Sequence, residues 1–362
     1  MNKNKLKFVF RVNGNKEIGM GHLMRCLYLA EYLQGPSLFL INGNGAVVEK
    51  VKAFGHDYRV ISSLTPKDFE VMIQTLESYP NRSEKIQPSE AEEIQEMKKW
   101  LCDVKNLILI TDLLSPSDHY LRSLKAIGHF LVSIDEMGQV LFPSNLVFNC
   151  NAVSHAKKYK TAKTTKIYMG KQFALLKDEF LNGAGLNIKE KVKKILVTCG
   201  GTDMKGLSIK VLKALKNFAK EIEVVLIKGF DFKFETELNS LLREIKPIQV
   251  LKNVQNMREQ MLSADIAFAS GGTTMYELAA LGVPSIILDQ YEHQNEFASE
   301  MEREGALLNL GLGVNADSKR IENAVFGLLP FKKRKEMSLA AKKAIDGRGA
   351  SRVAQIIQEH VT

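Results

Sequence analysis

Short apolar runs alternate with amphipathic helical patterns along most of this chain, and that alternation restricts its folds more than any other feature. Four of the apolar runs end in an acid or lead into a glycine-containing turn: 107–112, 130–135, 194–198 and 265–269. A helical pattern follows each turn. Strands that alternate with helices are typical of a parallel sheet covered by helices on both faces. The sequence therefore predicts an α/β fold.

The alternation is interrupted once and then restarts, which predicts two domains. A chain of 362 residues is also long for a single core. The interruption contains the glycine-rich segment 182–185 (NGAG), followed by a charged run. We predict an N-terminal α/β domain over residues 1–181, a linker over 182–190, and a C-terminal α/β domain over 191–362. Since ligands of open α/β sheets bind beyond the carboxyl ends of the strands, we expect a cleft between the two domains.

The formal net charge of +9 favours an anionic partner. Basic residues are scattered in short runs, and long basic arms with interleaved aromatic residues are absent. We therefore expect an anionic small-molecule substrate and no nucleic-acid partner. The sequence has no apolar run of about 18 residues, so no transmembrane helix is expected. The basic N-terminus leads into a strand pattern and lacks the features of a signal peptide.

Cysteines occur at positions 26, 102, 150 and 199, and no C-x-x-C pair is present. This usage indicates reduced thiols in a cytoplasmic protein, without a disulfide framework. The histidines have no companions at metal-ligand spacing, so we predict no metal site and no cofactor.

Residues 8–33 join a strand pattern to a helical pattern through a turn that ends in Gly19-Met20-Gly21-His22. Backbone amides at such a turn, together with the positive end of the helix dipole, favour a bound anion. A histidine there can contact both the ligand and its reacting atoms. The alternative is that the glycines only permit the turn and that His22 caps the helix. A dinucleotide fingerprint fits poorly, because the G-x-G-x-x-G spacing is absent.

The segment 270–277 (SGGTTMYE) enters a helical pattern directly after an apolar run. Gly271 and Gly272 would let phosphate oxygens approach the backbone amides, and Thr273 and Thr274 add hydroxyl donors. Glu277, one turn into the helix, could accept both hydroxyls of a ribose. The alternative is an ordinary helix start whose glutamate complements the dipole.

Other polar clusters follow predicted strands. The segment 289–295 (DQYEHQN) is either a sugar or nucleotide contact region or a solvated helix start. Residues 200–203 (GGTD) are explained without a ligand by a tight turn with an aspartate cap. Asp112 and Asp135, each at the end of an apolar run, are candidates for orienting His22 or binding substrate, with capping as the alternative.

Taken together, four segments resemble one group of enzymes: residues 11–30, GKQFALLKDEF at 170–180, GGTD at 200–203, and SGGTTMYELAALGVPSI at 270–286. They resemble the UDP-2,4-diacetamido-2,4,6-trideoxy-beta-L-altropyranose hydrolases of pseudaminic acid biosynthesis. They are also similar to the spore coat polysaccharide type of glycosyltransferase and, more distantly, to the GlcNAc transferase that makes lipid II. The resemblance covers nearly the whole chain and implies the GT-B fold of two Rossmann-like domains, in which the N-terminal domain binds the sugar or acceptor and the C-terminal domain binds the nucleotide.

The resemblance also implies roles for individual residues. His22 matches the histidine proposed to activate water for attack on the anomeric carbon, and Gly19 and Gly21 match the loop beneath the sugar and diphosphate. Gly272, Thr273 and Thr274 match the phosphate-binding loop and helix start. Glu277 matches the ribose-binding carboxylate of the related transferases, and Gln294 matches a polar residue near the donor sugar.

Two departures bear on the reaction. The hydrolases usually carry Asp-His-Tyr where this chain has Asp112-Leu113-Leu114, and Trp-Glu where it has Tyr276-Glu277. The segment 346–352 (DGRGASR) looks more like the spore coat type. The expected function is hydrolysis of a UDP-linked amino-deoxy sugar to UDP and free sugar in surface glycan biosynthesis. The alternative is an inverting UDP-sugar glycosyltransferase, which would add peripheral membrane association. A non-catalytic nucleotide-binding protein is the third alternative.

Overall fold

A computed structural model provides the structure of this chain. It describes residues 7–14, 20–42, 45–61, 88–102, 104–113, 116–138, 141–151, 159–181, 187–229, 232–245, 247–252 and 254–361. The helix predicted over 65–78, Gly19 and the hinge predicted over 182–185 lie outside these residues. Two compact units are present: unit 1 comprises Met1–Leu175 with Gly349–Thr362, and unit 2 comprises Leu176–Arg348.

Unit 1 is built on a seven-stranded parallel sheet with the strand order β3-β2-β1-β4-β5-β7-β9. A separate pair, β6 and β8, forms a second small sheet. The elements of unit 1 are β1 Lys7–Val12, α1 Gly21–Tyr32, β2 Ser37–Ile41, α2 Ala46–Ala53, β3 Asp57–Val60, α4 Pro88–Leu101, β4 Leu107–Asp112, α5 Asp118–Ile127, β5 Phe130–Ile134, β6 Leu141–Phe142, β7 Leu146–Asn149, β8 Lys160–Thr161, β9 Lys166–Met169, η2 Lys171–Phe173 and α13 Gly349–Val361.

Side-chain alternation along β1 explains how helices cover both faces of this sheet. Phe8, Phe10 and Val12 point to one face and join a core formed with α1, α2 and α13. Val9 points to the other face and packs in a core with residues of α4 and α5. The predicted parallel sheet with helices on both faces is confirmed for unit 1.

Unit 2 repeats the plan with a six-stranded parallel sheet of order β12-β11-β10-β13-β14-β15. This is the order of a Rossmann sheet, in which the connections change direction beside the first strand. The elements are η3 Asp178–Phe180, β10 Lys194–Thr198, α6 Leu207–Ala214, η4 Phe218–Lys220, β11 Glu223–Lys228, α7 Glu235–Glu244, β12 Ile248–Lys252, α8 Met257–Ser263, β13 Ile266–Ala269, α9 Thr273–Leu281, β14 Ser285–Asp289, α10 Glu292–Arg303, β15 Leu308–Leu312, η5 Gly313–Asn315, α11 Ser318–Leu328 and α12 Phe331–Ala344.

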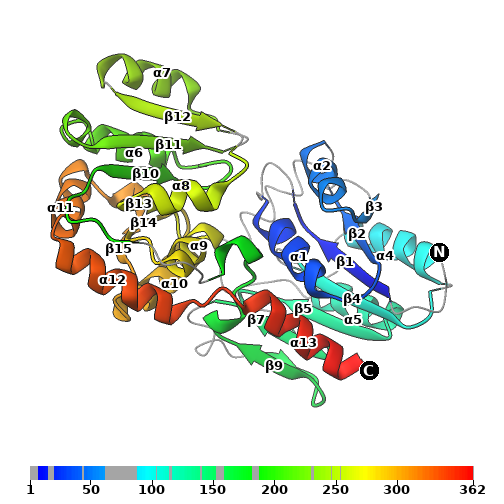
Figure 1. Cartoon of the computed structure of the whole chain (residues 1–362). Helices are drawn as coiled ribbons and strands as arrows, with labels where there is room; N and C mark the ends of the chain where they lie inside the picture. Colours follow the sequence, from blue (N-terminus) through cyan, green and yellow to red (C-terminus); the bar gives the residue numbers. More distant parts are fainter. Residues whose placement is uncertain are drawn as a thin grey trace. The chain divides into compact units, whose positions relative to one another are not determined.

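The helix α13 is placed differently from the sequence prediction, which assigned residues 191–362 to the C-terminal domain. It lies beside α1 in unit 1, as Figure 1 shows. Val353, Ala354 and Ile357 are buried in the same core as β1, which explains the placement. Gly349 permits the close approach, because a Cβ there would lie 2.1 Å from the backbone oxygen of Ala174.

None of the helices in the described part of the chain is long and apolar enough to cross a membrane.

Candidate functional site

His22 is the second residue of α1 and makes a direct contact with the sheet of unit 1. Its Nδ1 lies 2.7 Å from Oδ1 of Asp112. Asp112 is the last residue of β4 and is fully buried. β1 and β4 pair in parallel with Val12 opposite Asp112, so the strand end that carries the acid lies beside the strand that leads to α1. The structure thus brings His22 together with Asp112, one of the two strand-end acids that the sequence offered as its partner.

The charge state of Asp112 decides which imidazole nitrogen is free. Burial by itself would raise the pKa of this carboxyl, but the adjacent Arg25 guanidinium and the His22 ring outweigh it and hold the pKa well below its usual range. Asp112 is therefore an ionised acceptor. Nη2 of Arg25 also lies 3.0 Å from Nδ1 of His22, but the carboxylate at 2.7 Å is the shorter contact and can only accept, so Nδ1 donates its hydrogen to Asp112. This tautomer leaves the lone pair on Nε2, so the pair has the arrangement of a general base with its orienting carboxylate.

Asp135, the second strand-end candidate, has a structural role instead. Its Oδ2 accepts hydrogen bonds from the backbone amides of Met137 (2.9 Å) and Gly138 (2.6 Å) and from the hydroxyl of Tyr159 (2.7 Å). Burial raises its pKa. Asp135 thus caps the turn after β5, and capping was the alternative that the sequence left open.

The phosphate-binding segment predicted at 270–274 forms the turn from β13 into α9. Gly271 and Gly272 form the turn, and Thr273 and Thr274 begin the helix. Gly272 is the N-cap and brings no side chain to the first-turn amides. Neither threonine hydroxyl has a hydrogen-bond partner among the described residues. The first turn of α9 therefore has open donors and the positive end of the helix dipole.

Glu277 lies one turn into α9 and has no hydrogen bond to any described residue. Burial, assisted by the nearby charge of Glu179, raises the pKa of Glu277 to about 7. A carboxyl with unused acceptors suits a ligand that donates two hydrogen bonds, such as a ribose. Its position fits the prediction, and the role stays a prediction.

Asp289 is the first residue of the segment 289–295, which the sequence offered as a sugar or nucleotide contact region or a solvated helix start. It ends β14, is 1% exposed, and neither carboxylate oxygen has a hydrogen-bond partner in the described structure. Oδ1 lies directly against Gly271, since a Cβ added there would be 2.1 Å from it. Burial and then the charge of Glu292 raise the pKa of Asp289 to about 7. The strand-end position is visible in the sequence, but the unpaired oxygens are not.

The neighbouring glutamines tie the loops of unit 2 together. Gln294 accepts a hydrogen bond at Oε1 from the backbone amide of Gln290 (2.9 Å). The side-chain amide of Gln290 donates to the oxygen of Cys199 (3.0 Å) and to the hydroxyl of Ser270 (3.4 Å). The ends of β10, β13 and β14 are therefore joined at the turn before α9.

The turn at 200–203 is explained by a cap, as the sequence indicated. Oδ1 and Oδ2 of Asp203 accept from the amides of Leu207 (2.8 Å) and Ser208 (2.9 Å) at the start of α6.

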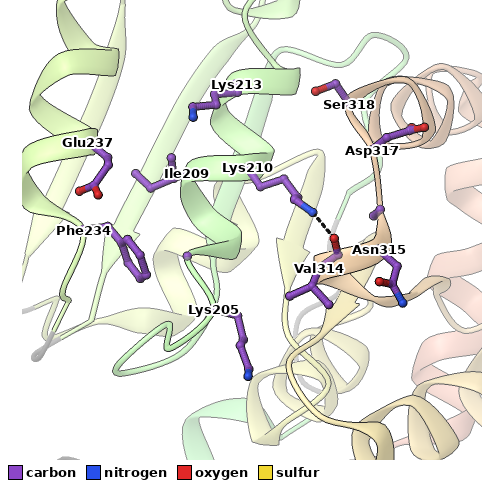
Figure 2. Close-up of a pocket in the computed structure, with 12 residues that line it drawn as sticks. Lys205, Ile209, Lys210, Lys213, Phe234, Glu237, Val314, Asn315, Asp317 and Ser318 are labelled. Carbon is purple, nitrogen blue, oxygen red and sulfur yellow. Dashed lines mark hydrogen bonds between the residues drawn. The ribbon is translucent and has the colours of Figure 1, made fainter.

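A pocket of about 580 Å³ lies beside α6 in unit 2, and no residue proposed from the sequence lines it (Figure 2). Its wall contains Lys205, Lys210 and Lys213 of the α6 region. The amine of Lys210 donates to the oxygens of Gly313 (2.8 Å) and Val314 (2.6 Å). Lys210 therefore holds η5 in place and is not available to a ligand in this arrangement.

The described part of the chain contains no group of three or more His, Cys, Asp or Glu side chains that could hold a metal ion.

The unpaired carboxyl of Asp289 gives unit 2 a pH-dependent stability. Because its folded pKa lies above the ordinary value of 3.8, the folded state binds the proton more tightly, and stability falls as the pH rises from about 4 to 7. We expect Asp289→Asn to raise the free energy of unfolding at pH 8 by on the order of 1–3 kcal/mol, with no gain at pH 4. Denaturant unfolding at both pH values, without nucleotide, measures this difference.

Asp203→Asn is the matched control, because Asp203 is also buried but uses both oxygens on backbone amides. It should lose stability at pH 8. An Asp289→Asn protein that is no more stable than the wild type at pH 8 would contradict the expectation.

Solved structures align with nearly the entire chain. MurG from Acinetobacter baumannii aligns with a TM-score of 0.67 at 15% identity, covering 98% of this chain and 99% of MurG. The rhamnosyltransferase SpnG, solved with thymidine diphosphate, aligns with a TM-score of 0.63 at 14% identity, covering 99% and 100%. The chain has the GT-B fold. Residues 194–356 of this GT-B chain also match the glycosyltransferase family 28 C-terminal domain.

Two of the curated relatives of this GT-B chain carry names from the groups that the resemblance suggested, and a third is an uncharacterized protein. The spore coat polysaccharide biosynthesis protein SpsG of Bacillus subtilis is 24% identical over 96% of both chains. The uncharacterized protein MJ1062 of Methanocaldococcus jannaschii is 25% identical over 80% of this chain and 57% of its own length. The pseudaminic acid cytidylyltransferase and UDP-2,4-diacetamido-2,4,6-trideoxy-beta-L-altropyranose hydrolase of Helicobacter pylori is 27% identical over 55% of this chain and 37% of its own length.

Proposed function

We propose that this chain hydrolyses a UDP-linked amino-deoxy sugar to UDP and the free sugar in nonulosonate (pseudaminic-acid-type) surface glycan biosynthesis. The observation that carries the proposal is the pair of His22 and Asp112, which fixes Nδ1 as the donor and leaves Nε2 as an acceptor. The hydrolase named among the relatives supports the substrate class.

The reaction follows from the free lone pair of Nε2. His22 takes a proton from water as the water oxygen forms a bond to C1 of the sugar. The bond from C1 to the phosphate oxygen breaks, and UDP leaves with the electron pair. One displacement inverts the configuration at C1. General-base assistance of this kind typically contributes ~10²–10⁴-fold to the rate.

Unit 2 supplies the nucleotide contacts in this proposal. The amides of Gly271 and Gly272 and the start of α9 at Thr273 and Thr274 would bind the diphosphate and stabilise it as it leaves. Glu277 would accept the ribose hydroxyls. In unit 1, Gly19 and Gly21 keep the role in sugar and diphosphate binding that the resemblance implies.

The loop after β14 would bind the sugar. Gln294 holds the backbone of this loop through Oε1, which leaves its amide hydrogens free to donate. Asp289 adds two free acceptors beside Gly271 for sugar hydroxyl or amide hydrogens.

Glycosyl transfer is the second candidate. Two observations favour it: the 96% coverage of both chains in the match to SpsG, and Leu113 after the strand-end acid where the hydrolases usually carry histidine. An acceptor hydroxyl would then replace water at Nε2, and the residue roles would otherwise be the same. An acceptor in a lipid-linked form would bring the protein to a membrane surface.

Incubation with a panel of UDP-sugars, with and without a membrane fraction, tests the proposal. Hydrolysis predicts UDP and free sugar in equal amounts, without any acceptor. Transfer predicts UDP release only when the membrane fraction is present, with the sugar recovered in that fraction. Failure to bind or release UDP with every sugar would overturn both candidates.

A further inference from the structure

Arg25 lies one helical turn after His22 on α1 and faces the same buried carboxylate. It is 9% exposed. Its Nε and Nη2 donate to the two oxygens of Asp112, with Nη2 to Oδ1 at 2.6 Å. The spacing of three residues places both side chains on one face of the helix. A single carboxylate therefore receives a two-point contact from Arg25 and one contact from His22.

Glu136 contacts the other end of the same guanidinium. The Nη1 atom of Arg25 donates to Oε1 of Glu136, which follows β5. The Glu136 side chain is 24% exposed, whereas that of Asp112 is 1% exposed. Arg25 is thus held from two directions, by the end of β4 and by the loop after β5.

The two-point contact from Arg25 fixes the orientation of the Asp112 carboxylate, which a single hydrogen bond would leave free to rotate. A carboxylate that only His22 contacted could rotate about its Cβ–Cγ bond. The planar fork of arginine matches the plane of a carboxylate and holds it in one orientation. That orientation presents Oδ1 to Nδ1 of His22 at 2.7 Å.

We infer that Arg25 and Glu136 are positioning residues for the His22 base, with Arg25 orienting and neutralising Asp112 and Glu136 anchoring Arg25. The inference rests on the proposed function, since it concerns how the proposed base is held. Neither residue need touch the substrate. The sequence offered no role for either residue.

The arrangement also sets the net charge beside His22. Asp112 and Glu136 each contribute −1 and Arg25 contributes +1. Two other titratable groups are close: Cys26, whose Sγ donates to Asp112 at 3.6 Å, and Cys150 after β7. Burial raises the pKa of both thiols, that of Cys150 to about 12, so both stay neutral. Among the described residues, Asp112, Glu136 and Arg25 together carry a net charge of −1, and removing Arg25 or Glu136 changes this sum in opposite directions.

The pH dependence of kcat/KM for UDP release tests this inference. Arg25→Gln removes a positive charge beside two carboxylates, which favours the imidazolium, so the acid limb should move to higher pH by about one unit. Glu136→Gln removes a negative charge, so the acid limb should move to lower pH by a few tenths of a unit. Arg25→Lys keeps the charge but loses the fork. The Arg25→Lys variant should therefore lower kcat about 10-fold and leave the acid limb of the pH profile in place.

A control variant and an NMR measurement complete this test. Arg122→Gln removes an exposed arginine of α5 in the same unit and should leave the profile unchanged. In the NMR spectrum, the low-field Nδ1 proton of His22 should be present in the wild type, present but shifted in Glu136→Gln, and lost in Arg25→Gln. Glu136 is partly exposed, so its variant should fold even if Arg25→Gln does not.

Acid limbs of Arg25→Gln and Glu136→Gln that stay in place, or that move in the same direction, would overturn the inference. A failure of the proposed function can be told apart from a failure of this inference. If His22 is not the base, UDP release survives His22→Ala. The resonance of the His22 Nδ1 proton does not depend on activity. It therefore reports on the contacts among His22, Asp112 and Arg25 whether or not the proposed function holds.

Discussion

Replacing His22 with alanine should lower kcat for UDP release by ~10²–10⁴-fold, because the general base is lost while the nucleotide contacts in unit 2 stay in place. KM and the affinity for UDP should change little. Steady-state kinetics of UDP release and calorimetric titration with UDP measure the two effects separately. The reason is structural: Nδ1 of His22 lies 2.7 Å from Oδ1 of the ionised Asp112, which can only accept its hydrogen, and Nη2 of Arg25 lies 3.0 Å from the same nitrogen.

Asp112→Asn should give a loss of similar size. An asparagine amide can donate to Nδ1, which would favour the tautomer with the hydrogen on Nε2 and remove the base. His119→Ala is the matched control, because His119 is an exposed residue of α5 in the same unit. UDP release at an undiminished rate in His22→Ala would remove His22 from the mechanism.

Replacing Gly271 with alanine should lower the affinity for UDP at least ~10-fold. The added Cβ would lie 2.1 Å from Oδ1 of Asp289 and 3.0 Å from Cβ of Gln294. The buried Asp289 carboxylate, the Gln294 side chain or the turn at Gly271 must therefore shift. Overpacking of this kind costs about 1–3 kcal/mol, and 1.4 kcal/mol corresponds to a factor of ten in affinity. Calorimetric titration with UDP measures the loss.

Gly327→Ala is the matched control for this substitution. Gly327 lies in α11 of the same unit, and a Cβ there would meet nothing within 4 Å. It should leave UDP affinity unchanged and add about 0.5–1 kcal/mol of stability. The double variant Gly271→Ala with Asp289→Ala should recover part of the lost affinity, since the clash is with the Asp289 side chain. Wild-type affinity in Gly271→Ala would show that the turn does not approach the nucleotide.

The sequence predicted the parts of the fold that depend on local patterns. The apolar runs and glycine turns marked most strands and the start of α9, and Asp112 was a candidate because it ends a strand. β15 was not predicted. Its sequence, Leu308-Asn309-Leu310-Gly311-Leu312, has no β-branched residue, and Gly311 has a positive φ of 68°. β15 is a strand because it pairs with β14 in the sheet, and not because its own residues favour a strand.

The remaining features depend on contacts between residues far apart in the chain. The apolar face of α13 is visible in the sequence, but nothing local indicates that it packs against α1. Arg25 could have been noticed from its spacing to His22, whereas its partner Glu136 is 111 positions away. The unpaired oxygens of Asp289 are a property of the packed loop and have no sequence signal.

The return of the chain to unit 1 through α13 has a consequence for protein synthesis. On the ribosome, unit 2 is complete before residues 349–361 emerge, whereas the core of unit 1 still lacks Val353, Ala354 and Ile357. The apolar face that α13 covers would stay exposed during that interval, when aggregation competes with folding. The unit that contains His22 would therefore finish folding last, although it is synthesised first.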